Sequence, residues 1–265
     1  MCFARHAIDK IPLMKKIIFL TAWLFAVTAC KTVQAPPPPE TIQEERMPYF
    51  KGNGNEPFWN ISISEDAIRF ESLLSGFESV TAPSVAPVKA MDANVKMYRA
   101  HTENIDIQIQ IEQAECVNSM SGAASPYAVT IEIKRKTDKD ATILKGCGAY
   151  LTDYRLYDIW ALEQLNGQKV TLADFGKELP IIEINSQTNT FIGFAGCNQM
   201  NGRLFYEKNT LRFTNVTTTR MACGPKNKEG EFLKALQSAT GYEIKNNRLW
   251  LSNPSGLLLV FKKID

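Results

Sequence analysis

Cysteine and histidine are the residues of this chain best suited to chemistry, and their number and spacing limit what that chemistry can be. The 265 residues contain six cysteines and two histidines, namely Cys2, Cys30, Cys116, Cys147, Cys197, Cys223, His6 and His101. Cys197 and Cys223 do not form the Cys-x-x-Cys pattern of redox and zinc sites. A structural zinc ion needs four cysteine or histidine ligands. We therefore predict no metal site.

Hydrolytic catalysis needs a nucleophile and a base, and the sequence offers no recognisable pair. Ser121 and Ser255 stand beside glycines, but neither belongs to a Gly-x-Ser-x-Gly elbow. His101 stands between an alanine and a threonine without an evident partner, which is typical of a surface residue. Glu56 could be a buried acid, but a solvated turn carboxylate before Pro57 is the interpretation we favour. With no glycine-rich phosphate loop either, we predict no enzyme, no catalytic residue and no cofactor.

The candidate for binding is a run of amide side chains directly after Cys197. It consists of Asn198, Gln199, Met200 and Asn201. Amide groups both donate and accept hydrogen bonds, so an exposed loop of this kind can hold a polar ligand. The alternative is that Asn198 and Asn201 bond to the turn backbone and only shape it. The sequence leaves both interpretations open.

The N-terminus resembles a bacterial lipoprotein signal. A charged start at Met14 precedes the apolar run from Ile17 to Ala26, which is too short to cross a bilayer of about 30 Å as a helix. Val27, Thr28 and Ala29 then lead to Cys30 in a pattern similar to the lipobox. The resemblance implies removal of residues 1–29, a diacylglycerol on the sulfur of Cys30 and an acyl chain such as palmitate on its amine. Two or three chains give stable anchoring. An ordinary secretory signal is the alternative, and in both cases Met14 is the expected true start.

Residues 30–47 form the lipidated N-terminus and a proline-rich linker. Lys31 follows the cysteine, where an aspartate would resemble a signal for inner-membrane retention, so we expect the outer membrane and its periplasmic face. Four successive prolines, from Pro36 to Pro39, favour a stiff spacer, although a disordered linker fits as well. Export places the remaining cysteines in an oxidising compartment. We therefore expect two disulfides, Cys116 with Cys147 and Cys197 with Cys223.

Charge argues against nucleic acid as a partner. Of 30 basic and 28 acidic residues, four basic and one acidic residue lie in positions 1–29, so 26 and 27 remain and the net charge is −1. A nearly neutral chain has no general field that attracts nucleic acid. The expected partners are the membrane, through Cys30, and an envelope protein or a small molecule.

Residues 48–152 show the alternation of half-buried strands. Isoleucines stand at every second position from Ile105 to Ile111, and the segment from Val129 to Ile133 repeats the pattern. No convincing helix interrupts this region. The Gly-x-Glu-Pro-Phe-Trp run that starts at Gly54 resembles an uncharacterised domain of bacterial envelope lipoproteins, which implies no known activity.

Residues 156–265 combine short strands with one helix. The turns Asn166-Gly167 and Asn246-Asn247 separate strand-like runs, and helical spacing marks the region from Lys226 to Thr240. The motifs that carry a resemblance are Trp160…Leu165-Asn166-Gly167, Gly196-Cys197-Asn198…Asn201-Gly202, Thr219-Arg220-Met221-Ala222-Cys223, Glu229…Phe232…Leu236 and Gly256-Leu257…Leu259…Phe261. Together they resemble the META domain of the HslJ-like heat-shock lipoproteins, which implies mostly antiparallel sheet with one main helix and links to envelope stress, motility or drug tolerance.

The sequence therefore predicts two small domains of class α+β, mostly antiparallel β: an all-β N-terminal domain and a META-like sheet with one main helix. The function that fits is a non-catalytic role of an outer-membrane lipoprotein in the envelope stress response, by binding a ligand or a protein. A periplasmic enzyme inhibitor, a weak hydrolase and a purely structural envelope protein are the alternatives.

Overall fold

The structure, a computed structural model, describes residues 47–264, which belong to one compact unit. Antiparallel sheet dominates these residues, and α2 is the main helix, so the predicted fold class is confirmed. None of the helices in this described part is long and apolar enough to cross a membrane.

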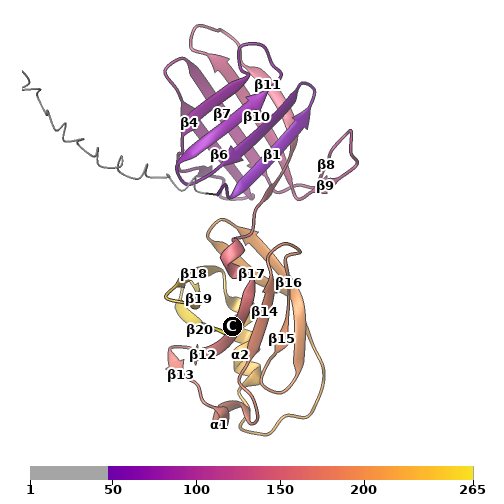
Figure 1. The fold of residues 1–265 in the computed structure, drawn as a ribbon, viewed down its shortest axis with the longest axis vertical. Coiled ribbons are helices and arrows are strands. Elements are labelled where there is room, and N and C mark those ends of the chain that lie inside the picture. Colours follow the sequence, from indigo (N-terminus) through magenta and orange to yellow (C-terminus); the bar gives the residue numbers. More distant parts are fainter. Residues whose placement is uncertain (1–46, 265) are drawn as a thin grey trace, which may run out of the picture. The chain divides into compact units, whose positions relative to one another are not determined.

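Residues 47–152, here called the N-terminal module, form a nine-stranded sheet in the order β4-β3-β2-β1-β11-β10-β7-β6-β5, together with a separate two-stranded sheet, β8-β9 (Figure 1). The strands are β1 (Phe50–Asn55), β2 (Phe58–Ile63), β3 (Ala67–Ser72), β4 (Ser79–Pro83), β5 (Val88–Lys89), β6 (Val95–His101), β7 (Ile105–Glu112), β8 (Cys116–Val117), β9 (Ala124–Ser125), β10 (Tyr127–Arg135) and β11 (Thr142–Tyr150).

The alternating isoleucines of β7 form the centre of this sheet's core. Ile109 stands opposite Ile131 of β10, and Ile111 stands opposite Val129. All four side chains are buried, whereas the polar residues between them point to the other face. Burial of each such side chain contributes roughly 1.5–3 kcal/mol. The two strands predicted from this alternation are confirmed.

Residues 153–264, here called the C-terminal module, form a second nine-stranded sheet in the order β13-β12-β14-β15-β16-β17-β18-β19-β20. The elements are a 3₁₀ turn η1 (Tyr154–Leu156), β12 (Asp158–Leu165), β13 (Gln168–Lys169), α1 (Leu172–Phe175), β14 (Ile181–Asn185), β15 (Thr190–Phe194), β16 (Gln199–Glu207), β17 (Thr210–Thr218), α2 (Glu229–Ser238), β18 (Gly241–Lys245), β19 (Arg248–Asn253) and β20 (Gly256–Ile264).

An additional pairing joins the ends of this sheet. Strand β12 pairs with β20 from Ile159 opposite Ile264 to Leu165 opposite Leu259, so β12 and the strands from β14 to β20 form a closed ring that leaves β13 outside. Helix α2 packs against β17 and β20 and buries Phe232, Ala235 and Leu236 in the core. The helix expected between Lys226 and Thr240 is thus confirmed, with narrower bounds.

Tight turns follow the sequence signals closely. Asn166 and Gly167 both have positive φ, 50° and 77°, which is the geometry that a two-residue type I′ hairpin requires. Asn246 and Asn247 repeat it with φ of 52° and 55°. The short helix α1 was not expected, because four residues are too few for helical periodicity to show.

The carboxylate of Glu207 is buried and belongs neither to the lipidation site nor to the candidate binding loop. Glu207, at the end of β16, accepts hydrogen bonds from Lys96 Nζ at 2.7 Å, from Asn94 Nδ2 at 2.6 Å and from the Tyr127 hydroxyl. Burial alone raises the pKa of Glu207, but the hydrogen bonds from Lys96, Tyr127 and Asn94 outweigh it and hold the pKa below its ordinary value.

Candidate functional site

The lipidation site lies outside the described residues. Cys30, the signal segment 1–29 and the linker precede residue 47, so the anchor and its acyl chains stay predictions.

The structure contains both expected disulfides. Cys116 of β8 is bonded to Cys147 of β11 with the Cα atoms 5.5 Å apart. Cys197, just before β16, is bonded to Cys223, which lies between β17 and α2, with a Cα separation of 5.9 Å. Each bond fastens a segment of little regular structure to a long strand or its end. Each disulfide therefore holds one such segment against its sheet.

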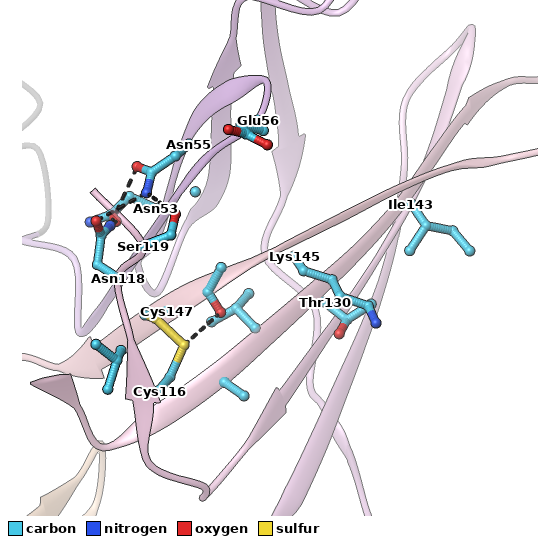
Figure 2. A pocket seen from close by; sticks show the side chains of 15 residues that line it. Asn53, Asn55, Glu56, Cys116, Asn118, Ser119, Thr130, Ile143, Lys145 and Cys147 are labelled. Atoms are coloured by element: carbon cyan, nitrogen blue, oxygen red, sulfur yellow. Dashed lines mark hydrogen bonds between the residues drawn. A yellow bond between two sulfur atoms is a disulfide. The ribbon is translucent and has the colours of Figure 1, made fainter. Parts of the chain in front are cut away.

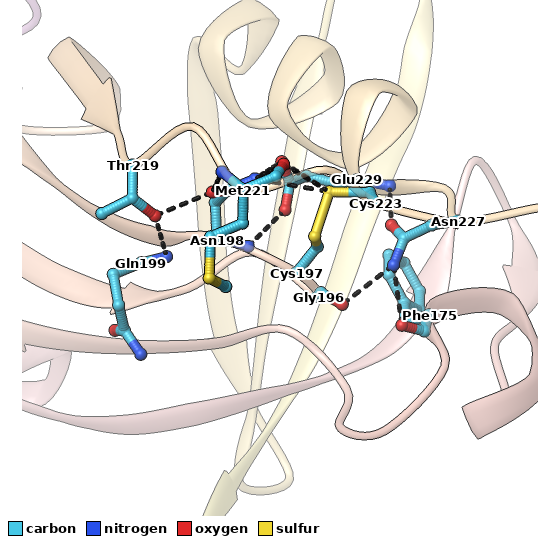
Figure 3. Close-up of a disulfide and its surroundings, with 10 residues drawn as sticks. All are labelled: Phe175, Gly196, Cys197, Asn198, Gln199, Thr219, Met221, Cys223, Asn227 and Glu229. Carbon is cyan, nitrogen blue, oxygen red and sulfur yellow. Dashed lines mark hydrogen bonds between the residues drawn. A yellow bond between two sulfur atoms is a disulfide. The ribbon is translucent and has the colours of Figure 1, made fainter. Parts of the chain in front are cut away.

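Asn198 lies at the centre of the second disulfide's surroundings (Figure 3). Its side-chain Oδ1 accepts from the Thr219 hydroxyl at 2.8 Å and from the Met221 amide at 2.7 Å. Its Nδ2 donates to Glu229 Oε1 at 2.8 Å, and its backbone amide donates to Glu229 Oε2 at 2.6 Å. Asn198 is only 4% exposed. Its polar groups hold the chain after β17 against the start of α2.

The other three residues of the candidate binding loop are the first three residues of strand β16 and do not form a free loop. Met200 is buried in the core, while Gln199 and Asn201 are exposed. The Asn201 side chain accepts from the Thr217 hydroxyl across the strands at 3.0 Å. Among the candidate loop residues, Gln199 therefore has the side-chain amide that is most open to a ligand.

A second set of contacts fastens α1 to the start of α2. Asn227 Nδ2 donates to the carbonyl of Phe175 at 2.7 Å and to that of Gly196 at 2.9 Å. Asp174 forms an ion pair with Lys228 at 2.8 Å. Bonds from Lys228 and from the amide and hydroxyl of Thr171 lower the pKa of Asp174 to about 2.

One trio in the described part has the composition of a metal site. The sulfurs of Cys197 and Cys223 and a carboxylate oxygen of Glu229 lie within 4.8 Å of one another. Cysteine binds metals as a thiolate, so these sulfurs could act as ligands only after reduction of the disulfide. In the oxidised protein, Glu229 instead binds Asn198.

The residues considered for catalysis lie in separate places. His101 ends β6 and contacts Asp106 Oδ1 at 2.7 Å in an exposed hairpin. Ser121 follows β8 and donates its backbone amide to Asn118, and Ser255 lies in the turn between β19 and β20. The structure brings neither serine into contact with His101.

Sequence reasoning did not identify a pocket in the N-terminal module. It has a volume of about 820 Å³ and lies on the solvent face of the sheet, over β1, β10 and β11. The hairpin of β8 and β9, fastened by Cys116–Cys147, forms its side (Figure 2). The lining residues are Asn53, Gly54, Asn55, Glu56, Cys116, Val117, Asn118, Ser119, Ala128, Val129, Thr130, Ile143, Lys145, Gly146 and Cys147. The dense asparagines and glycines before Pro57 were the available signal.

Asparagine side chains connect the hairpin to β1 at one edge of the pocket (Figure 2). Asn55 Nδ2 donates to Asn118 Oδ1 and to Ser119 Oγ, both at 3.0 Å. Asn118 Nδ2 donates to Asn53 Oδ1 at 3.2 Å. The same Asn118 oxygen accepts the amides of Met120 and Ser121, which closes the hairpin tip. The pocket is therefore held at one point by a covalent bond and at another by an amide network.

Comparison with known proteins identifies one part of the chain. Residues 155–265 match the family model of the META domain, whereas no curated protein matches the chain significantly. An NMR structure of a protein from Burkholderia xenovorans is 25% identical, with a TM-score of 0.34, over 49% of this chain and 98% of that one. A crystal structure of a DUF4847 family protein from Bacteroides vulgatus is 17% identical, with a TM-score of 0.32, over 42% and 96%. The match at residues 155–265 supports the sequence prediction of a META domain at residues 156–265.

Proposed function

We propose that this protein is a non-catalytic binding protein of the bacterial envelope, anchored by lipid at Cys30 to the periplasmic face of the outer membrane and active under envelope stress. The observation that supports export most directly is the pair of disulfides, Cys116–Cys147 and Cys197–Cys223. Disulfides persist in oxidising compartments and are rare in the cytosol. The META match at residues 155–265 agrees with a non-catalytic, envelope-associated role.

Metabolic labelling tests the anchor. Cells fed with radioactive palmitate and expressing the full chain should incorporate label, and the protein should fractionate with the outer membrane. The Cys30→Ser variant should lose the label and no longer be held in the membrane, because a chain without lipid has no stable attachment. Cys2→Ser is the matched control and should behave like the wild type, since Cys2 precedes the expected start at Met14. Label retained by Cys30→Ser would refute the anchor.

Crosslinked capture from envelope extracts tests binding through the exposed side-chain amides of Gln199 and Asn201 on β16. Gln199→Ala and Asn201→Ala remove exposed amides and leave the core intact. Asn198→Ala is unsuitable, because it would remove the hydrogen bonds that hold Glu229 and Met221. Loss of a wild-type partner from both exposed variants supports this surface. Equal recovery of every partner by the wild type and both variants excludes it.

A further inference from the structure

We propose that the pocket beside the β8–β9 hairpin binds a short peptide with a free α-amine and a free α-carboxylate. This inference rests on the proposed function in one respect, namely that the protein is a binding protein, and it does not depend on the lipid anchor. The site belongs entirely to the N-terminal module and is distinct from the exposed amides of Gln199 and Asn201 on β16.

The pocket is held open before any ligand arrives. The Cys116–Cys147 bond fixes one end of the hairpin to β11, and Asn118 fixes its tip to Asn53 and Asn55 of β1. A site that is already ordered loses less conformational entropy on binding than a flexible one. Its volume of about 820 Å³ falls within the range of about 300–1,000 Å³ that is usual for small-ligand sites.

Two exposed side chains of opposite charge line the pocket and have no protein partner among the described residues. Glu56 and Lys145 both line the pocket, and neither forms an ion pair or a side-chain hydrogen bond with another residue between 47 and 264. A ligand with both an ammonium and a carboxylate group can satisfy Glu56 and Lys145 at the same time. Charge-assisted hydrogen bonds of this kind are about twice as strong as neutral ones.

The remaining lining suits the middle of a peptide. Each peptide unit offers one N–H donor and one C=O acceptor. Asn53 Nδ2 and the hydroxyls of Ser119 and Thr130 supply matching groups that the amide network leaves open. Val117 and Ile143 are 58% and 60% exposed, so they offer aliphatic surface to small side chains. A neutral sugar offers no charged group to either exposed side chain, Glu56 or Lys145, which favours the peptide.

Calorimetry of the full chain carrying Cys30→Ser, which lacks the lipid, can test this with trialanine as the probe. N-acetyl-trialanine lacks the ammonium group, and trialanine amide lacks the carboxylate. Lys145→Met and Glu56→Gln remove the two pocket charges. Lys51→Met on β1 and Glu71→Gln on β3 are matched controls, because both residues are exposed and lie outside the lining. Lys145→Arg keeps the charge and tests whether the charge carries the effect, while unchanged binding of trialanine amide by Lys145→Met shows that this variant is folded.

Each substitution should weaken the binding only of those ligands that carry the charged group which the replaced residue would bind. Lys145→Met should weaken trialanine binding by about tenfold or more but should leave the affinity for trialanine amide unchanged. Glu56→Gln should weaken trialanine binding similarly and leave N-acetyl-trialanine unchanged. The two controls and Lys145→Arg should bind like the wild type.

Three results would overturn the proposal: no saturable heat with trialanine, equal weakening by the control variants, or tighter binding of chitotriose than of trialanine. None of them would affect the palmitate label or the membrane fractionation of the wild type. A failure of this site is therefore distinguishable from a failure of the proposed lipid-anchored function.

Discussion

Asn198 shows how one amide side chain can serve the fold. Its oxygen accepts two hydrogen bonds and its nitrogen donates to Glu229, while the residue itself is almost completely buried. A buried polar group that loses its partner is costly, because no water replaces the bond. Asn198 therefore serves the fold, and within the predicted binding loop the exposed amides belong to its neighbours Gln199 and Asn201.

Asn198→Asp should destabilise the C-terminal module by roughly 2–3 kcal/mol near neutral pH, because it replaces the donor to Glu229 by a second carboxylate. Urea unfolding measured near pH 7 checks this. Asn201→Asp, on the exposed side of β16, is the control and should change the free energy of unfolding little. An Asn198→Asp protein as stable as the wild type would show that the Asn198–Glu229 contact does not matter.

At the scale of elements, the β8–β9 hairpin depends on its attachments. Each of its strands is two residues long, and an isolated hairpin of this kind is marginally stable in water. The bond to Cys147 and the Asn118 contacts supply what the short strands lack. The pocket beside the hairpin exists because of these attachments.

The paired substitution Cys116→Ser with Cys147→Ser should lower the free energy of unfolding by about 3.5 kcal/mol on the chain-entropy model, since the bond closes a loop of 31 residues. Amide hydrogen exchange should accelerate most at residues 116–125. The corresponding double variant at Cys197 and Cys223 is the comparison, because it should leave exchange in this hairpin unchanged. Uniform acceleration across both modules would contradict a local role of the bond.

The contact between α1 and α2 should respond to acid. The pKa of Asp174 is lowered from 3.8 to about 2, so its bonds with Lys228 and Thr171 stabilise the folded state fully above about pH 4, and this stabilisation is lost as the pH falls through about 2. Asp174→Asn should therefore reduce the melting temperature near pH 6 and make little difference near pH 2. Calorimetric melting at both pH values checks this. Asp140→Asn, an exposed position, serves as the control. A constant effect of Asp174→Asn at both pH values would disprove the ion-pair contribution.

At the scale of the whole molecule, Glu207 brings together residues that are far apart in sequence. Asn94, Lys96 and Tyr127 all donate to its carboxylate, across 80 or more positions. The side chains of Lys96 and Glu207 are only 13% and 9% exposed. Removing one member of such a pair leaves a buried charge without compensation.

Glu207→Ala should therefore lower the free energy of unfolding by about 3 kcal/mol near pH 7, because Lys96 loses its partner. The folded pKa of Glu207 is lowered, so this contribution is present above the unfolded pKa of 4.5 and fades as the pH falls below it. Urea unfolding over a pH series would reveal both effects. Glu243→Ala breaks the exposed pair with Lys245 and should be nearly neutral. Equal effects of the two variants would argue against a special role of Glu207.

Local features of the sequence predicted the elements of this protein well. The alternating isoleucines of β7 indicated its strand, and the Asn166-Gly167 pair indicated a type I′ turn that the positive φ angles confirm. An even cysteine count in an exported chain predicted disulfides, and the place of each two cysteines within one folded segment predicted the pairs Cys116–Cys147 and Cys197–Cys223. The strand and the turn could be predicted because side-chain period and turn conformation depend on neighbours within a few residues.

Only the tertiary structure decided which distant segments meet. It closed the ring between β12 and β20, placed Glu229 against Asn198, and folded the β8–β9 hairpin beside β1 to form a pocket. No local pattern contains these contacts, because many pairings bury the same apolar residues and the choice among them depends on packing of the whole chain. The sequence by itself thus predicted the strands with clear alternation, the main helix and the cysteine pairs, whereas the chemical surroundings of Asn198, Glu207 and Lys145 arose from long-range packing.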